Sequence, residues 1–170
     1  MVPASQEKHM GVAAKNPYEN DDELEGQEAR AGEVDGGVTV QGVHHIAIAV
    51  VDMDLTLDHY RNVFGLTVET RELLEDEGID VATLLVGGVA IQLIAPTRDD
   101  ADLAAYLDEW GPGLHHLGFT VEDVASATAA LEAEGYEAVD TEPHVGPAGS
   151  QVVYVNPHDI DGTIIQLVQD

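Results

Sequence analysis

The sequence predicts an α+β fold made of two tandem βαβββ modules. Two stretches with nearly the same text open the modules, GVHHIAIAVVDM at residues 42–53 and GLHHLGFTVEDV at residues 113–124. The tripeptide IQL occurs near the end of each half, at 91–93 and again at 165–167. Repeated local motifs within a repeated order of strands and helices indicate an internal duplication. Because one such unit alone buries too little surface, the two units are expected to pack together.

The first module is expected to begin with a strand over residues 43–51, which is rich in strong β-formers. Asp52 or Asp54 can cap a helix over residues 55–64, and Gly65 stands where a glycine ends such a helix. Three further strands, separated by acidic or glycine turns, are expected at residues 66–74, 79–88 and 89–96.

A connecting helix is expected within residues 97–110, because this stretch has an acidic first turn and ends at the motif GPG. The second module then repeats the first, with a strand over 114–121 and a helix from residue 124 that Asp123 caps and Gly135 ends. The remaining strands of this module are expected at residues 136–140, 150–157 and 162–169.

The chain is long enough for one well-buried domain. Residues 1–40 are polar and acidic without lasting periodicity, so we expect a weakly ordered N-terminal extension there. A single domain is expected over the rest, with the following parts: module one at 42–96, the connecting helix at 97–112 and module two at 113–170 within a domain that spans 41–170.

The charge is strongly acidic, with 33 Asp and Glu against 6 Lys and Arg and a formal net charge of −27. Such a surface repels nucleic acids and anionic membranes, and it favours solubility at high salt, as in halophilic proteins. The chain has no cysteine, so any metal must be held by histidine, carboxylate, amide or water. We expect a cytoplasmic protein, because no apolar run is long enough to span a bilayer and the first residues contain no signal core.

Alternation along the opening strands separates the two histidines of each pair, because successive side chains point to opposite faces. His44 shares a face with bulky isoleucine and valine residues, whereas His45 shares the other face with two alanines. In the second copy His115 belongs to the bulky row, and His116 lies with a glycine and a threonine. We therefore expect the second histidine of each pair to face the concave side of the sheet.

The same reasoning places the glutamine of each IQL motif on the inner face, opposite its isoleucine and leucine neighbours. A buried polar group left unpaired costs about 1 to 3 kcal/mol, whereas a divalent metal ion would satisfy nitrogen and amide oxygen donors together and leave positions open for water or substrate. Hydrogen-bonded core residues are the alternative, which we keep for His44 and His115 and leave open for the glutamines. The expected metal site consists of His45, Gln92, His116 and Gln166.

With these features in hand, residues 42–169 resemble the vicinal oxygen chelate (glyoxalase/bleomycin resistance/dioxygenase) superfamily, and within it most closely the methylmalonyl-CoA epimerases. The resemblance rests on HIAIAV with a following helix that ends in FGL, on GPGLHHLGFTVEDV, on EPHVGPAG and on NPHDIDGTIIQLVQ. It implies an open, cup-shaped mixed sheet with helices outside, around one divalent ion. It also implies that His45, Gln92, His116 and Gln166 hold this ion, which can be Zn, Co, Ni, Mn, Mg or Fe.

The resemblance further implies a metal-dependent isomerase or lyase, epimerase-like or lactoylglutathione lyase-like. In such enzymes the metal polarises a carbonyl, a carboxylate removes the neighbouring proton, and the metal-chelated enolate is reprotonated. The family usually has a glutamate where Gln166 stands, and that glutamate also carries the proton. Glutamine can coordinate but cannot accept a proton. Candidate substitutes as base are Asp80, Glu142 and Asp161.

Two other functions remain open. An extradiol-type dioxygenase would use the same scaffold, but it prefers two histidines and a carboxylate around Fe(II). A non-catalytic protein that binds a small ligand in the cup is favoured by Gln166. A small-molecule substrate fits either enzyme class, and one smaller than a coenzyme A ester fits the charge better, because the domain has only Arg61, Arg71 and Arg98 to meet phosphates. Modules of this family pair within one chain or across a homodimer, and both arrangements are open here.

Overall fold

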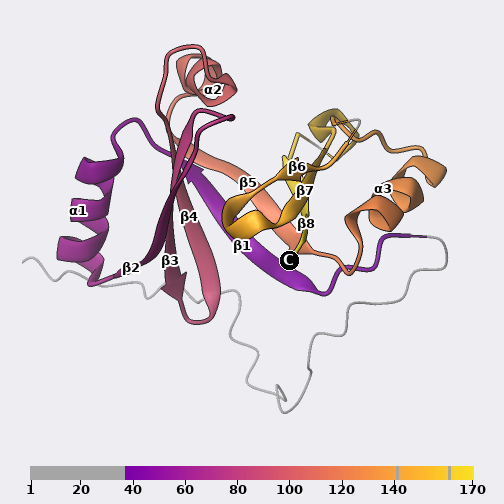
Figure 1. The fold of residues 1–170 in the computed structure, drawn as a ribbon, viewed down its shortest axis with the longest axis horizontal. Helices are drawn as coiled ribbons and strands as arrows, with labels where there is room; N and C mark the ends of the chain where they lie inside the picture. The colour runs from indigo at the N-terminus through magenta and orange to yellow at the C-terminus, as the bar shows by residue number, and fades with distance from the viewer. Residues whose placement is uncertain (1–36, 141, 161) are drawn as a thin grey trace, which may run out of the picture.

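The structure is a computed structural model that describes residues 37–140, 142–160 and 162–170 (Figure 1). The expected acidic extension therefore lies almost entirely outside the described residues. The strands and helices run in the following order: β1 (Gly42–Ala49), α1 (Met53–Phe64), β2 (Val68–Leu74), β3 (Ile79–Val86), β4 (Val89–Pro96), α2 (Asp102–Trp110), β5 (Gly113–Thr120), α3 (Val124–Ala133), β6 (His144–Val145), η1 (Pro147–Gly149), β7 (Gln151–Val155), η2 (Pro157–Asp159) and β8 (Ile165–Gln169).

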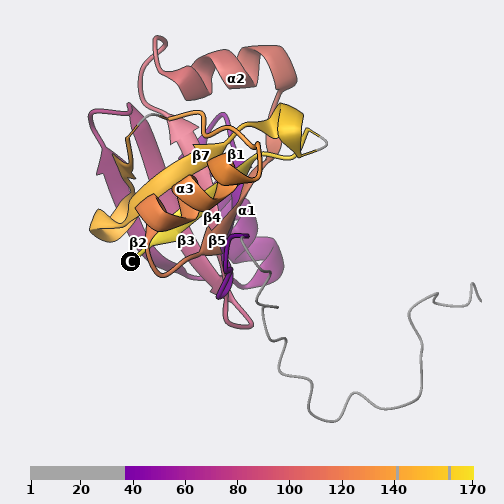
Figure 2. The ribbon, with the colours of Figure 1, turned by 90° about the vertical axis from the view of Figure 1, so that its right-hand side faces the viewer.

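All eight strands belong to one mixed sheet, in the order β2-β3-β4-β1-β5-β8-β7-β6. Each half has its opening strand parallel to its last strand, β1 to β4 and β5 to β8, and the halves meet where β1 and β5 pair antiparallel. Figures 1 and 2 show a curled sheet with α1 outside one half, α3 outside the other, and α2 above one end. The predicted fold of two βαβββ modules in a cup-shaped sheet is confirmed.

Capping side chains set the helix starts as the sequence predicts. The Asp52 side chain accepts a hydrogen bond from the Leu55 amide at 2.9 Å, which decides between the two aspartates considered for this role. Gly65 ends the helix with φ 69°, in the left-handed region that glycine adopts without strain. Asp123 caps α3 in the same way, through the amide of Ser126.

Three apolar clusters hold the molecule together. One lies between α1 and the outer face of the first half, around Leu57 and Leu84, and a second lies between α3 and the second half, around Val153. The third contains Ala47, Ile94 and Leu103, so α2 packs against the inner face of the sheet. This helix therefore forms part of the wall of the cup. No helix in the described ranges is long and apolar enough to cross a membrane.

The prediction of a strand at residues 136–140 is wrong. This segment makes only one isolated bridge, Ala138 to Val155, and the short edge strand of the second half is β6 at 144–145. The physical reason is Asp140, whose side chain accepts the Tyr154 amide at 3.1 Å in place of a backbone carbonyl. When a side chain replaces a backbone carbonyl as acceptor in this way, the regular backbone pairing between the two strands stops.

Candidate functional site

The four polar residues expected on the inner face lie in two rows that cross the sheet. In one row Gln92 of β4 is opposite Ala47 of β1, which is opposite His116 of β5. The other row, from module two to module one, consists of Gln166 of β8, Gly118 of β5 and His45 of β1. Each row therefore has a glutamine, a small residue and a histidine, and each histidine comes from the module that does not supply the glutamine.

His45 and His116 face one another, with their Nε2 atoms 2.8 Å apart. Both side chains are buried, at 3% and 7% exposure. Burial, together with the neighbouring His44, lowers the pKa of His45 to about 4. Burial also lowers the pKa of His116 to about 2, helped by His45 and His115 and opposed by Gln166. At neutral pH these imidazoles are therefore uncharged and can offer a nitrogen lone pair.

Gly118 makes room for the His45 ring. A Cβ atom at this position would stand 2.5 Å from Nδ1 of His45, closer than real Cβ contacts come. Ala47, at the equivalent place in the other row, is fully buried. Small residues between each glutamine and histidine therefore allow the imidazoles to lie over the sheet.

The two glutamines are also buried, at 7% for Gln92 and 6% for Gln166, and both line the cavity. The Gln166 amide is close enough to His116 and to Tyr154 to influence the pKa of both side chains. Burial is the main cause that raises the pKa of Tyr154, which keeps this phenol neutral. The Gln166 amide thus lies next to the His116 imidazole, although within the described residues no three His, Asp or Glu side chains form a metal-binding group.

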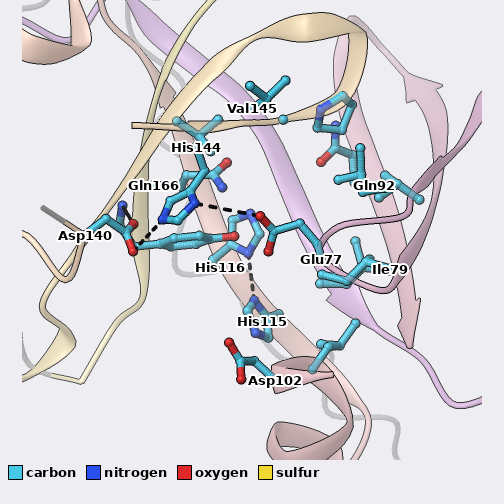
Figure 3. Close-up of a pocket in the computed structure, with 18 of the residues that line it drawn as sticks. Glu77, Ile79, Gln92, Asp102, His115, His116, Asp140, His144, Val145 and Gln166 are labelled. Carbon is cyan, nitrogen blue, oxygen red and sulfur yellow. Dashed lines mark hydrogen bonds and ion pairs between the residues drawn. The ribbon is translucent and has the colours of Figure 1, made fainter. Parts of the chain in front are cut away.

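A cavity of about 390 Å³ opens above these residues, a size that suits a small ligand (Figure 3). Apolar side chains from both modules, such as Val81 and Val152, line much of it, and α2 contributes Leu103, Tyr106 and Asp102. His116 and the two glutamines therefore lie at an interior surface that a ligand can reach, and His45 lies directly behind His116.

His44 and His115 do not follow strict alternation, contrary to the expectation. The β1–β5 pairing shifts register at both places, passing from Val43 to His45 in β1 and leaving out His115 in β5. Such bulges re-aim side chains. As a result His44 Nδ1 lies 2.8 Å from His45 Nδ1, and His115 Nδ1 lies 2.7 Å from His116 Nδ1. His115 also lines the cavity, so its interpretation as an ordinary core residue was incomplete.

Three titratable residues at the rim of the cavity were missed by sequence reasoning. His144 Nε2 lies 2.9 Å from Asp140 Oδ1, and His144 Nδ1 lies 3.8 Å from Glu77 Oε1 (Figure 3). Glu77 belongs to the β2–β3 turn of module one, and His144 belongs to β6 of module two. Nothing in the local sequence marks Glu77 and Asp140, because acidic residues are common in so acidic a chain. His144 lies in the motif EPHVGPAG, but the motif assigned it no role.

The candidate bases named from the sequence are not brought to the cavity. Asp80 lies between the cavity-lining Ile79 and Val81, so it points to the opposite face, where it pairs with Arg71 at 2.7 Å. Glu142 is exposed and does not line the cavity. Asp161 lies outside the described residues.

The donor set fits a divalent cation. Two neutral imidazole nitrogens and two amide oxygens are typical ligands of first-row metals. Two nitrogens bound to one tetrahedral zinc ion lie about 3.3 Å apart, from Zn–N bonds of about 2.05 Å. The Nε2 atoms at 2.8 Å would have to separate by only about half an ångström.

The arginines of the described chain are all engaged by acidic partners. Arg71 is held by Asp80 and Asp54, Arg98 pairs with Asp100, and Arg61 lies 3.9 Å from Asp58. No arginine lines the cavity.

The curled sheet with this inner-face site belongs to a known class. The family model described as the Glyoxalase/Bleomycin resistance protein/Dioxygenase superfamily matches residues 44–154, and the chain belongs to this superfamily. A relative, the ethylmalonyl-CoA/methylmalonyl-CoA epimerase of Cereibacter sphaeroides, is 30% identical over 130 residues, which are 75% of this chain and 96% of that protein.

Solved structures agree. Methylmalonyl-CoA epimerase from Mycobacterium tuberculosis has a TM-score of 0.73 and 31% identity over 80% of this chain and 91% of that one. A variant of the Streptomyces coelicolor methylmalonyl-CoA epimerase, in complex with 2-nitronate-propionyl-CoA, has a TM-score of 0.73 and 31% identity over 77% of this chain and 95% of its own. These proteins are isomerases, and the expectation of an enzyme of this superfamily is confirmed.

Proposed function

We propose that this protein is a metal-dependent isomerase or lyase that moves a proton on a carbon next to a carbonyl group, as an epimerase does. The observation that carries the proposal is the facing pair His45 and His116, because His116, Gln92 and Gln166 all line a cavity of about 390 Å³. The relatives support it, because they are epimerases of acyl-CoA substrates by name.

The residues proposed to hold one divalent ion are His45, Gln92, His116 and Gln166. Such an ion supplies Lewis acidity, which polarises a carbonyl oxygen and is worth several kcal/mol. The histidines are suited to this task because burial keeps them uncharged at neutral pH. The largely apolar walls keep water away from the reacting carbon.

Proton transfer requires a group other than Gln166, because an amide cannot accept a proton. We propose Glu77 for this role, since its carboxylate lines the cavity and lies 3.8 Å from His144. Glu77 would take the proton as the C–H bond breaks and the electron pair moves to the carbonyl oxygen. His144, hydrogen-bonded to Asp140, would supply a proton from solvent to the carbon as the electron pair returns from the carbonyl oxygen, and Glu77 would release its own proton to solvent.

The experiment that tests the metal site is metal analysis of the purified full chain. The wild type is expected to carry about one divalent ion, and His45→Ala and His116→Ala are each expected to lose it. His59→Ala, at an exposed position on α1, serves as the control. Retention of the ion by both site variants contradicts the proposed ligands.

Activity is tested separately with methylmalonyl-CoA and with the methylglyoxal–glutathione hemithioacetal, each in the presence and absence of a chelator. We expect turnover of at least one of the two substrates. The chelator should abolish this turnover, and added metal should restore it. Because the described arginines are paired with carboxylates, weak saturation by the coenzyme A ester is expected. Activity on neither substrate in the metal-loaded protein excludes both reactions.

A second candidate is a non-catalytic protein that binds a small ligand in the same cavity, and Gln166 is the observation that favours it. Under this alternative the wild type binds metal and has no activity, and Gln166→Glu creates activity by adding a carboxylate on the floor of the cavity. A wild type that is already active excludes it.

A further inference from the structure

The two register shifts place a second imidazole behind each of the facing histidines. The shift in β1 brings His44 Nδ1 to 2.8 Å from His45 Nδ1, and the shift in β5 brings His115 Nδ1 to 2.7 Å from His116 Nδ1. The same atoms meet in both modules. The four rings therefore form a continuous hydrogen-bonded chain through the Nε2 contact of His45 and His116.

At one end of this chain the hydrogen-bond direction is fixed. Asp170 Oδ1 lies 3.1 Å from His44 Nε2, and a carboxylate can only accept, so His44 Nε2 donates. A neutral imidazole has a single N–H, which leaves Nδ1 of His44 as an acceptor. Nδ1 of His45 must then donate to it. His45 consequently presents its lone pair on Nε2, the atom that faces His116.

We propose that His44 and His115 are positioning residues for the metal site, each holding the orientation of the imidazole beside it, with His44 also fixing the tautomer that presents Nε2 of His45. This inference rests on the metal site of the proposed function. Histidines that bind metals almost always donate their second ring N–H to a partner, and loss of that partner weakens metal binding. The repeated His-His dipeptide thus pairs a ligand with its support.

The two supports differ in their surroundings, which makes His44 the cleaner one to test. His115 packs against the Tyr106 ring at a centroid distance of 4.3 Å and lines the cavity, so its replacement also alters ligand contacts. His44 lines neither that cavity nor the second one near α2. A change at His44 therefore reaches a ligand only through His45.

The experiment measures zinc affinity of the full chain by competition with a chromophoric chelator, and the visible spectrum of the cobalt-substituted protein. His44→Leu fills similar space without an acceptor and is expected to weaken zinc binding about 10- to 100-fold and to change the cobalt spectrum. His44→Asn, whose amide oxygen can replace Nδ1 as acceptor, is expected to restore affinity close to the wild type. His115→Leu should weaken binding in the same direction, and the control His59→Leu should not.

A folded His44→Leu protein with wild-type zinc affinity overturns the inference while leaving the proposed function intact. A wild type that binds no zinc overturns the metal site itself. Nitrogen NMR of the histidines in the metal-free wild type tests the support without any metal or variant. The expected result is a proton on Nδ1 of His45, and a proton on Nε2 instead overturns the role given to His44.

Discussion

At the scale of single residues, the site depends on two small side chains as much as on its polar groups. Gly118 and Ala47 occupy equivalent places in the two rows, between a glutamine and a histidine. The His45 ring lies so close over Gly118 that no side chain fits there. The position of His45, a proposed metal ligand, thus depends on the lack of a Cβ atom at Gly118 on the neighbouring strand.

Gly118→Ala is expected to displace His45 and to weaken metal binding by at least about 10-fold, as misplacement of a ligand does. The nearest atoms that a Cβ at Gly118 meets all belong to the His45 ring, so the ring must rotate or the strands must move apart. Zinc titration of the full chain measures the effect. Gly42→Ala is the matched control, because a Cβ there meets nothing within 4 Å. Equal zinc affinity of the two variants contradicts the close-contact argument.

Stability of the metal-free protein is expected to fall as pH decreases from about 6.5 towards 4. Burial lowers the pKa of His45 and of His115 to about 4 and that of His116 to about 2, from the ordinary histidine value of about 6.5 that holds in the unfolded chain. Below pH 6.5 the unfolded chain binds protons that the folded chain does not, so each such group costs about 1.4 kcal/mol per pH unit.

Thermal unfolding between pH 7 and 4.5 measures this slope. His115→Phe removes one of the three groups and should make the dependence on pH shallower, whereas His59→Phe, on the exposed face of α1, should not. A stability that rises on acidification over this range contradicts the assignment of buried neutral imidazoles.

At the scale of elements, two segments from opposite modules meet at the rim of the cavity. The turn between β2 and β3 carries Glu77, and the segment around β6 carries His144. A second link joins the same regions, because the Ala148 amide donates to Glu72 at 3.0 Å. The proposed proton-transfer groups are therefore held by a turn and by a two-residue edge strand rather than by the long central strands of the sheet.

Arg98→Met is expected to misplace Glu77 and to lower turnover without a change in metal affinity. The Arg98 guanidinium donates to the carbonyls of Glu75 and Asp76 at 2.9 Å and packs over Gly78, so it holds the turn in shape. Methionine keeps the aliphatic stem and removes these donors.

Two measurements check this prediction, the turnover number and the hydrogen exchange rate of the Gly78 amide, which should increase. Arg61→Met is the control, since Arg61 reaches only Asp58 on its own helix, at 3.9 Å. Unchanged exchange at Gly78 contradicts the role given to Arg98.

The sequence predicted the regular parts of this molecule and missed the irregular ones. Alternation and the repeated IQL motif placed four polar residues on one face, because a regular strand has a fixed side-chain period. The same rule misplaced His44 and His115, because register shifts depend on the partner strand and leave no local signal. Glu77 and His144 were missed for a related reason, since the β2–β3 turn and β6 are distant in the sequence and meet only in the folded sheet.

At the scale of the whole molecule, the main feature is a net charge of −27. The three arginines of the described ranges pair with only four carboxylates, so most acidic side chains there have no arginine partner. Self-repulsion of this kind destabilises the compact state at low ionic strength. We propose that the chain works in concentrated salt.

The melting temperature is therefore expected to rise between about 0.1 and 1 M KCl, as the screening length falls from about 10 Å to about 3 Å. Differential scanning calorimetry measures it. A variant in which four exposed acids are replaced by their amides should show a weaker dependence on salt; these are Asp108, Glu109, Glu132 and Glu134. A melting temperature that falls with KCl contradicts the repulsion argument.

Each of the two rows joins strands of both modules, and this has a consequence for how the sequence can evolve. The imidazole of each copy rests on the strand of the other copy, His45 over Gly118 and His116 opposite Ala47. Loss of one module, or a larger residue at its Gly118 or Ala47 position, therefore disturbs the histidine of the other module. A single copy would therefore need a second molecule of itself to assemble the same centre.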